Sequence, residues 1–228
     1  PLQGSRDDGQ TMLDARVHMR SLPAPPLMFI NHPARTATAM GRWGDVEPDE
    51  LRAWHAAAPQ VLVGMEGAPG HQATRVHRGL YRNADAPTMG GFDQMTATVG
   101  GIWDTLLSEG HRFWITASSD SHVNQRDGGS DFDPGQYSKT HVWARRDAED
   151  ILDGLRHGRM FAVTGDLIDA LELRATANDD EARSATMGGT LSMSPGSSMR
   201  VELRVRVPAS ANHAGQHPAL DHVELIVG

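Results

Sequence analysis

The sequence contains no cysteine, and this absence limits the chemistry available to the chain. Without cysteine there can be no disulfide scaffold, no thiolate zinc site and no cysteine nucleophile. Any bound metal ion must therefore be held by imidazole nitrogen and carboxylate oxygen. The chain offers both kinds of donor in quantity, with 12 histidines and 29 acidic residues.

The chain also lacks an excess of positive charge and a long hydrophobic run. Its 21 basic residues are outnumbered by the acidic ones, giving a net charge of −8, whereas a binder of the nucleic-acid backbone needs a basic face. No segment approaches the roughly 18 consecutive apolar residues of a membrane span. We therefore expect a soluble protein with a small-molecule substrate and with no nucleic-acid or membrane partner. The lack of a visible secretory signal favours a cytoplasmic over a secreted location, and a signal upstream of Pro1 stays open.

The pattern of hydrophobic residues divides the 228 residues into two parts near residue 170. Before that point, short apolar runs alternate with helical patterns, which is typical of β/α units. After it, apolar and polar residues alternate with a period of two, as in half-buried antiparallel strands. We predict an α/β fold in which residues 1–168 form the β/α part. Residues 169–228 are predicted to form a small β-sandwich or an antiparallel extension.

Particular elements follow from these patterns. Continuous apolar runs predict buried parallel strands, apolar on both faces, at residues 27–30, 61–65 and 113–117. Helical spacing and capping residues predict helices at residues 45–58, 93–109 and 147–157. Strict alternation predicts strands at residues 171–175 and 201–207, and the last apolar run predicts a further strand at 223–227. A turn is predicted at residues 178–180.

Polar side chains capable of chemistry follow each predicted parallel strand: Asn31 and His32 after the first, Glu66 and His71 after the second, Asp120 and His122 after the third. Ligands of β/α folds bind beyond the carboxyl ends of the strands, so these side chains are expected at one rim. Residues i and i+2 leaving a strand point to the same side, so Asp120 and His122 can converge on one cation. Together the three clusters predict a metal site.

Each residue alone has a simpler interpretation. Asp120 and His122 taken by themselves are typical of a helix cap beside a surface histidine, and His32 of a hydrogen-bonded loop residue. Glu66 alone is typical of a salt-bridged residue at a strand end. His141, on an expected edge strand, is within reach of the rim but is better explained as structural. The metal interpretation depends on all three clusters occurring together.

Three motifs resemble the later motifs of the PHP (polymerase and histidinol phosphatase) superfamily. They are Phe-Ile-Asn-His-Pro at 29–33, Gly-Met-Glu-Gly at 64–67 and Ser-Ser-Asp-Ser-His at 118–122. Residues 66–72 and 158–165 are similar to the branch that includes aryl carbamate hydrolases. The resemblance covers residues 25–168. It implies a distorted (β/α)7 barrel, TIM-like, that holds two or three zinc, manganese or iron ions and hydrolyses phosphoesters, carbamates or related esters.

The resemblance also implies roles for individual residues. His32, Asp120 and His122 match metal ligands, Glu66 matches a site residue and His71 would face substrate. We expect Glu66, His71 and Arg35 to serve the reaction, with Arg35 or His71 stabilising negative charge that develops on the substrate. Asn31 and Ser119 are expected to support the ligands through hydrogen bonds.

The family's opening His-x-His motif does not occur in the sequence. The chain therefore resembles the C-terminal portion of a metallohydrolase, whose barrel an upstream segment or a second chain would complete. We expect a metal-dependent, phosphoesterase-like hydrolase that uses a metal-activated water, although this portion alone need not be active. The alternative is a non-catalytic fragment or binding module with an incomplete metal site. A β tail that recruits a sugar or a partner is disfavoured, because the tail has no aromatic platform.

Overall fold

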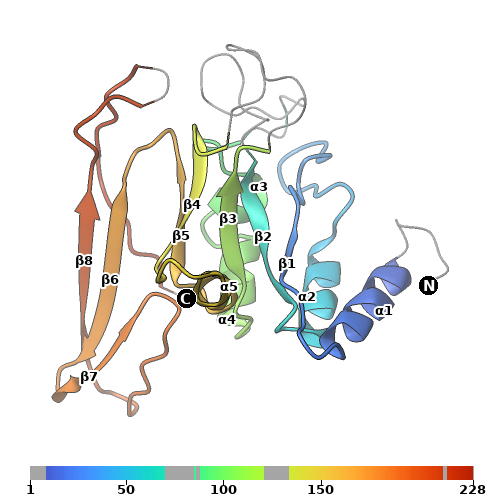
Figure 1. Ribbon diagram of the computed structural model, residues 1–228, viewed down its shortest axis with the longest axis horizontal. Helices are drawn as coiled ribbons and strands as arrows, with labels where there is room; N and C mark the ends of the chain where they lie inside the picture. Colours follow the sequence, from blue (N-terminus) through green and yellow to red (C-terminus); the bar gives the residue numbers. More distant parts are fainter. Residues whose placement is uncertain (1–8, 70–84, 86–87, 121–133, 213–214, 228) are drawn as a thin grey trace.

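Figure 1 shows the computed structural model, which describes residues 9–69, 85, 88–120, 134–212 and 215–227. The fold is mixed α/β, with helices, a parallel sheet and separate antiparallel sheets. The predicted α/β class is thereby confirmed, and the strands of these ranges form open sheets without a closed barrel. None of the helices in the same ranges is long and apolar enough to cross a membrane.

The parallel sheet is built from the three apolar runs. The sheet contains β1 (Met28–Ile30), β2 (Leu62–Pro69) and β3 (Trp114–Ser118). They pair in parallel, as predicted, and their order in the sheet is β1-β2-β3. Burial on both faces holds for the central strand, where residues 62–68 are all buried. The outer strands are buried only in part, because a sheet of three strands is too narrow for its edges to be fully covered.

In the described residues, five helices accompany the strands. Helices α2 (Pro48–Ala57) and α5 (Ala148–Arg156) lie within two of the predicted ranges. The single helix predicted at residues 93–109 is wrong, because two shorter helices, α3 (Gln94–Ala97) and α4 (Ile102–Ser108), occupy this range. The helix is interrupted at Gly100, whose φ of +71° lies in the left-handed region. Helix α1 (Gly9–Arg20) was not predicted.

The remaining strands are antiparallel. Strands β4 (Ser138–Val142) and β5 (Met160–Thr164) form a pair, and β6 (Ala170–Ala177), β7 (Asp180–Thr186) and β8 (Met199–Arg206) form a sheet in the order β7-β6-β8. The strands predicted at 171–175 and 201–207 and the turn before β7 are confirmed. The strand predicted at 223–227 is wrong: this segment has no strand structure, and Val227 is 78% exposed. A run of strand-favouring residues forms a strand only where a neighbouring edge is available to pair with it.

The hydrophobic core lies between the parallel sheet and the helices. Its buried side chains come from α2, the sheet, α3, α4 and the approach to β3: Leu51, Trp54, Leu62, Met65, Met95, Leu106, Phe113 and Ile115. Full burial of one such side chain contributes about 1.5–3 kcal/mol. The core therefore fixes the position of the sheet whose carboxyl ends carry the polar clusters.

Helix α1 packs against α2 through an arginine. Arg16 is fully buried, with its guanidinium 4.4 Å from the centre of the Trp54 ring, and its Nη1 donates to the Met12 carbonyl oxygen at 2.6 Å. Burial lowers the pKa of Arg16 to about 10, although Glu50 opposes the shift. The contact is a cation–π interaction that joins the two helices.

A pair of histidines joins α2 to the segment before β3. His55 is 5% exposed, and its Nδ1 lies 2.9 Å from Nδ1 of His111, while its Nε2 lies 3.1 Å from the carbonyl oxygen of Arg112. Because a carbonyl can only accept, Nε2 of His55 carries the proton and Nδ1 accepts one from His111. Burial, together with the neighbouring His111, lowers the pKa of His55.

This arrangement makes stability depend on pH. Since the pKa of His55 in the folded protein lies below its ordinary value of 6.5, the unfolded chain binds more protons as the pH falls below 6.5. We expect the contribution of His55 to the free energy of unfolding to be lost as the pH falls from 6.5 toward the lowered pKa of the folded protein. Urea unfolding at several pH values should show a decline that is reduced in His55→Gln and unchanged in His18→Gln, an exposed control. An equal decline in all three proteins would contradict this role.

Candidate metal centre

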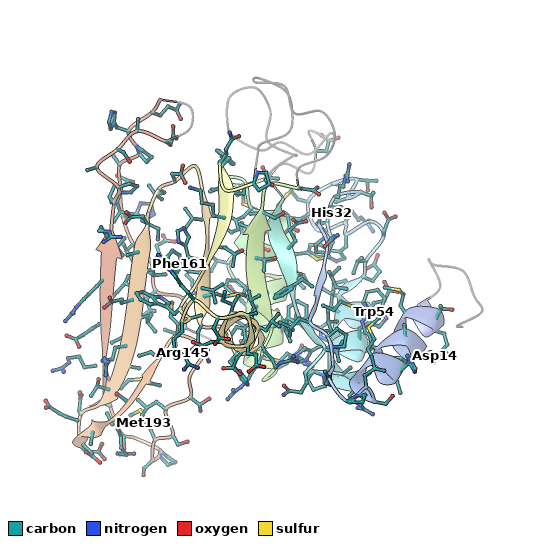
Figure 2. All side chains as sticks on the ribbon, viewed as in Figure 1. Asp14, His32, Trp54, Arg145, Phe161 and Met193 are labelled. Atoms are coloured by element: carbon teal, nitrogen blue, oxygen red, sulfur yellow. The ribbon has the colours of Figure 1, made fainter. Side chains whose placement is uncertain are left out.

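Three of the predicted site residues converge at the carboxyl end of the parallel sheet. His32 follows β1, Glu66 lies within β2 and Asp120 follows β3, and their potential ligand atoms all lie within 4.8 Å of one another. Figure 2 shows His32 at the upper end of the sheet in that view. The convergence follows from the parallel pairing, because it brings the carboxyl ends of the three strands to one edge.

The carboxylate of Glu66 connects the ends of all three strands. Glu66 is 7% exposed; its Oε2 accepts the backbone N–H of His32 at 3.2 Å, and its Oε1 accepts the hydroxyl of Ser118. The same Ser118 oxygen accepts the backbone N–H of Asp120 at 3.3 Å. Glu66 therefore holds both neighbouring segments of the cluster in place while remaining part of it.

The backbone at two of the three residues has an uncommon conformation. The φ angle is +29° at His32 and +47° at Asp120, in the left-handed region that residues other than glycine seldom adopt. Such a conformation costs about 1–3 kcal/mol and persists only where surrounding contacts impose it. Both residues lie just past the strands whose ends form the cluster, two positions after β1 and β3 respectively.

Arg35, which the sequence analysis expects to stabilise negative charge on the substrate, lies beside His32 of the cluster. Its Nη1 is 3.4 Å from Nε2 of His32, and its backbone N–H donates to the His32 carbonyl oxygen at 3.0 Å. A guanidinium can only donate, so the imidazole nitrogen is the acceptor. The turn after His32 therefore places a guanidinium beside the imidazole of the cluster.

The donor set suits a divalent transition metal. One imidazole and two carboxylates are ligands that zinc, manganese and iron accept. At metal–ligand distances of about 2.0–2.2 Å, two ligands on opposite sides of an ion lie about 4.2 Å apart. The spread of up to 4.8 Å among the three side chains is therefore close to what one ion requires.

The other predicted residues have different positions. Asn31 is exposed and lines a groove between β1 and the helices α1 and α2. Ser119 is buried, and it is the preceding residue, Ser118, that binds Glu66. His141 stacks on Phe161 with the ring centres 4.7 Å apart, within the β4–β5 pair. His71 and His122 lie outside the described residues.

The sequence analysis missed Asp93, which ties the cluster to the rest of the fold. Asp93 is fully buried; its carboxylate accepts the backbone N–H of Thr96 at 2.9 Å, and its own N–H donates to the Gly67 carbonyl oxygen at 2.7 Å. A backbone hydrogen bond from Ala34 also reaches the carboxylate, and burial raises its pKa to about 7. Asp93 thus links the residue after Glu66 to the turn after His32. In sequence it is an ordinary helix cap, so nothing marks this second role.

Gln94 holds the same turn from the next position. It is 1% exposed, its Oε1 accepts the N–H of Gly41 at 2.7 Å, and its Nε2 donates to the carbonyl oxygens of Ala39 and Arg42, each at 3.2 Å. All three contacts lie on the loop that begins at His32. The loop therefore owes its position to two consecutive buried polar side chains.

Gly67 permits α3 to approach the sheet closely enough for these contacts. A Cβ atom at this position would lie 2.4 Å from Oγ1 of Thr96 and 2.8 Å from Cγ2 of Ile115. The pairing of β2 with β3 also shifts register between Glu66 and Ala68. A larger residue at position 67 would separate α3 from the sheet and displace Asp93.

We expect Asp93→Ala to lower the free energy of unfolding by about 1–3 kcal/mol, because buried backbone N–H groups lose their acceptor. The same variant should loosen the loop that carries His32 and so weaken Mn²⁺ binding at the cluster. Asp93→Asn keeps an acceptor oxygen and should restore both properties. Urea unfolding and calorimetric Mn²⁺ titration provide the measurements. Equal Mn²⁺ affinity in the alanine variant and the wild type would show that Asp93 does not position the cluster.

Comparison of the chain with protein-family models, with curated proteins and with solved structures gave no match. A functional assignment therefore depends on the chemistry of the cluster and on the residues that hold it. The geometry brings three ligand-type side chains together, adds a neighbouring guanidinium, and fixes them through buried hydrogen bonds.

Proposed function

We propose that His32, Glu66 and Asp120 bind a divalent metal ion and that the chain belongs to a metal-dependent hydrolase. The observation that carries the proposal is the convergence of these three ligand types within 4.8 Å. Two of the three hold strained backbone conformations, which is common at functional sites. The motifs of the PHP superfamily contribute the expected reaction class, hydrolysis of a phosphoester or of a carbamate or related ester.

A divalent ion bound by these residues would supply a water molecule of lowered pKa and would polarise the oxygen of the electrophile. The residues of the chain provide the remaining requirements. Glu66 is fixed by its two hydrogen bonds, so it is preorganised as a ligand rather than free to rotate. Arg35 presents its guanidinium at the edge of the cluster, where it would stabilise the negative charge of a phosphoryl group or a tetrahedral carbon centre.

We propose that the parallel sheet belongs to a distorted (β/α)7 barrel of the PHP type, within the predicted segment 1–168. The edge position of β1 supports this interpretation, because among the described strands β1 pairs with β2 alone and its other edge has no partner strand. An upstream segment or a second chain would then supply the missing strands at that edge. The same added part would carry further metal ligands, including the His-x-His motif that this sequence lacks.

A non-catalytic fragment or binding module is the alternative, and one observation favours it. The three described ligands suffice for one ion, whereas the resemblance implies two or three ions of zinc, manganese or iron. Metal stoichiometry separates the two functions. Two equivalents per complete protein support the enzyme, and one weakly bound equivalent without turnover supports the binding module.

Removal of one ligand tests the metal site directly. Glu66→Gln should lower the affinity for Mn²⁺ or Zn²⁺ by about 10–100-fold, because the amide lacks the charge and keeps only one oxygen. The control is Glu181→Gln, which removes an exposed carboxylate on β7 and should bind metal normally. Isothermal titration calorimetry measures both affinities. Identical affinities in the two variants would refute the assignment of the cluster.

Hydrolysis of nitrophenyl phosphate and of a naphthyl carbamate tests the reaction. Activity should disappear with a chelator and return with added Mn²⁺ or Zn²⁺, and His122→Ala should lower the rate by about 100-fold or more, as for the loss of a group that holds the catalytic ion. The exposed control His18→Ala should be fully active. Full activity of His122→Ala, or activity that survives complete chelation, would overturn the proposed reaction. The ratio of the two rates distinguishes a phosphoesterase from a carbamate hydrolase.

A further inference from the structure

A second cavity lies away from the metal cluster, between the C-terminal sheet and the β4–α5 region. It has a volume of about 450 Å³ and is lined by residues of β6, β8 and the segments around β5 and β7. This volume is within the range of about 300–1,000 Å³ that is typical of small-molecule sites. In Figure 1 the sheet of β6 and β8 stands at the left, on the side of β4 and β5 opposite to β1.

The sheet contributes two pairs of opposite charge to this cavity. The register places Glu172 directly opposite Arg204 and Arg174 directly opposite Glu202. Because side chains alternate along a strand, all four project from the same face, and all four line the cavity. The result is a balanced arrangement in which acid and base alternate, both along each strand and across the pair.

The opposite wall supplies an aromatic ring. Trp143 directly follows β4, and its indole N–H donates to the Leu171 carbonyl oxygen at 3.1 Å, which fixes the ring against the sheet while the residue stays 45% exposed. Arg159 also lines the cavity, and its guanidinium is already engaged by Asp150 at 3.2 Å and by Asp153 at 2.6 Å. The cavity therefore combines an ordered aromatic face with charges that balance.

This combination selects for one class of ligand. The C–H face of a sugar ring packs against an aromatic face, and its hydroxyls both donate to carboxylates and accept from guanidinium groups. A phosphate would meet two carboxylates as well as two guanidinium groups on the sheet, so the lining gives it little net attraction. A wholly apolar molecule would cover four charged groups without offering them hydrogen bonds. We propose that this cavity binds a neutral carbohydrate of one or two rings.

The aromatic platform was not visible from the tail itself. Residues 169–228 contain no tryptophan, tyrosine or phenylalanine, so the sequence disfavoured a sugar-binding tail. The structure supplies the ring from the other part of the chain, because Trp143 pairs by its backbone N–H with the Arg159 carbonyl oxygen at 2.7 Å and thereby faces the sheet. The site is thus formed jointly by the two predicted parts.

Saturation-transfer NMR on the whole chain tests the proposal with glucose, mannose, maltose and cellobiose, and with acetate and inorganic phosphate as anionic probes. At least one sugar should bind, with weaker or absent binding of the anions. Trp143→Ala should weaken that binding by about tenfold or more, whereas Trp143→Phe, which keeps a flat ring, should stay within about threefold of the wild type.

Because Trp143→Ala could also disturb folding, two exposed positions that leave the packing unchanged provide a second test. Glu202→Gln changes an exposed carboxylate of the cavity without removing volume, and it should weaken sugar binding. Arg146→Gln changes an exposed charge that does not line the cavity, and it should bind sugar as the wild type does. The proposal is overturned if none of the four sugars binds, if an anion binds in their place, or if Trp143→Ala and Glu202→Gln both bind sugar normally. Metal binding at the other cluster does not enter any of these readouts.

Discussion

The buried carboxylate of Glu66 holds together the segments that leave the carboxyl ends of the parallel strands. Glu66 lies on the central strand, so both of its oxygens can reach the segments that leave the strands on either side. A charged group in the interior is tolerated only where donors surround it. The backbone N–H of His32 and the hydroxyl of Ser118 meet that requirement, and in doing so they set the separation of His32 from Asp120.

Most of the elements that carry the cluster were predictable, and those that were missed have physical reasons. The apolar runs at 27–30, 61–65 and 113–117 indicated strands because interior strands need apolar residues on both faces. Helix α1 was missed because its one fully buried side chain is Arg16, which apolar periodicity cannot reveal. Residues 223–227 are rich in the valine and isoleucine that strands favour, yet a strand also needs a partner edge, and no local pattern encodes one.

The cluster itself was partly predictable. The rule that parallel strands meet at their carboxyl ends was enough to bring His32, Glu66 and Asp120 together. It could not identify Ser118 over Ser119, because the choice depends on which of two neighbouring hydroxyls faces the central strand. Nor could it identify Asp93, because its hydrogen bonds with Gly67 and Ala34 arise only when α3 packs closely against the sheet at Gly67.

At His32 and Asp120, the residue that best suits the left-handed backbone differs from the residue that the proposed metal site needs. A glycine at either position would adopt the observed φ without strain, yet it would delete a side chain that the proposed metal site needs. Evolution under a requirement for stability alone would drift toward such replacements. A histidine and an aspartate at these two positions are what selection for the proposed metal site would leave behind in the backbone angles.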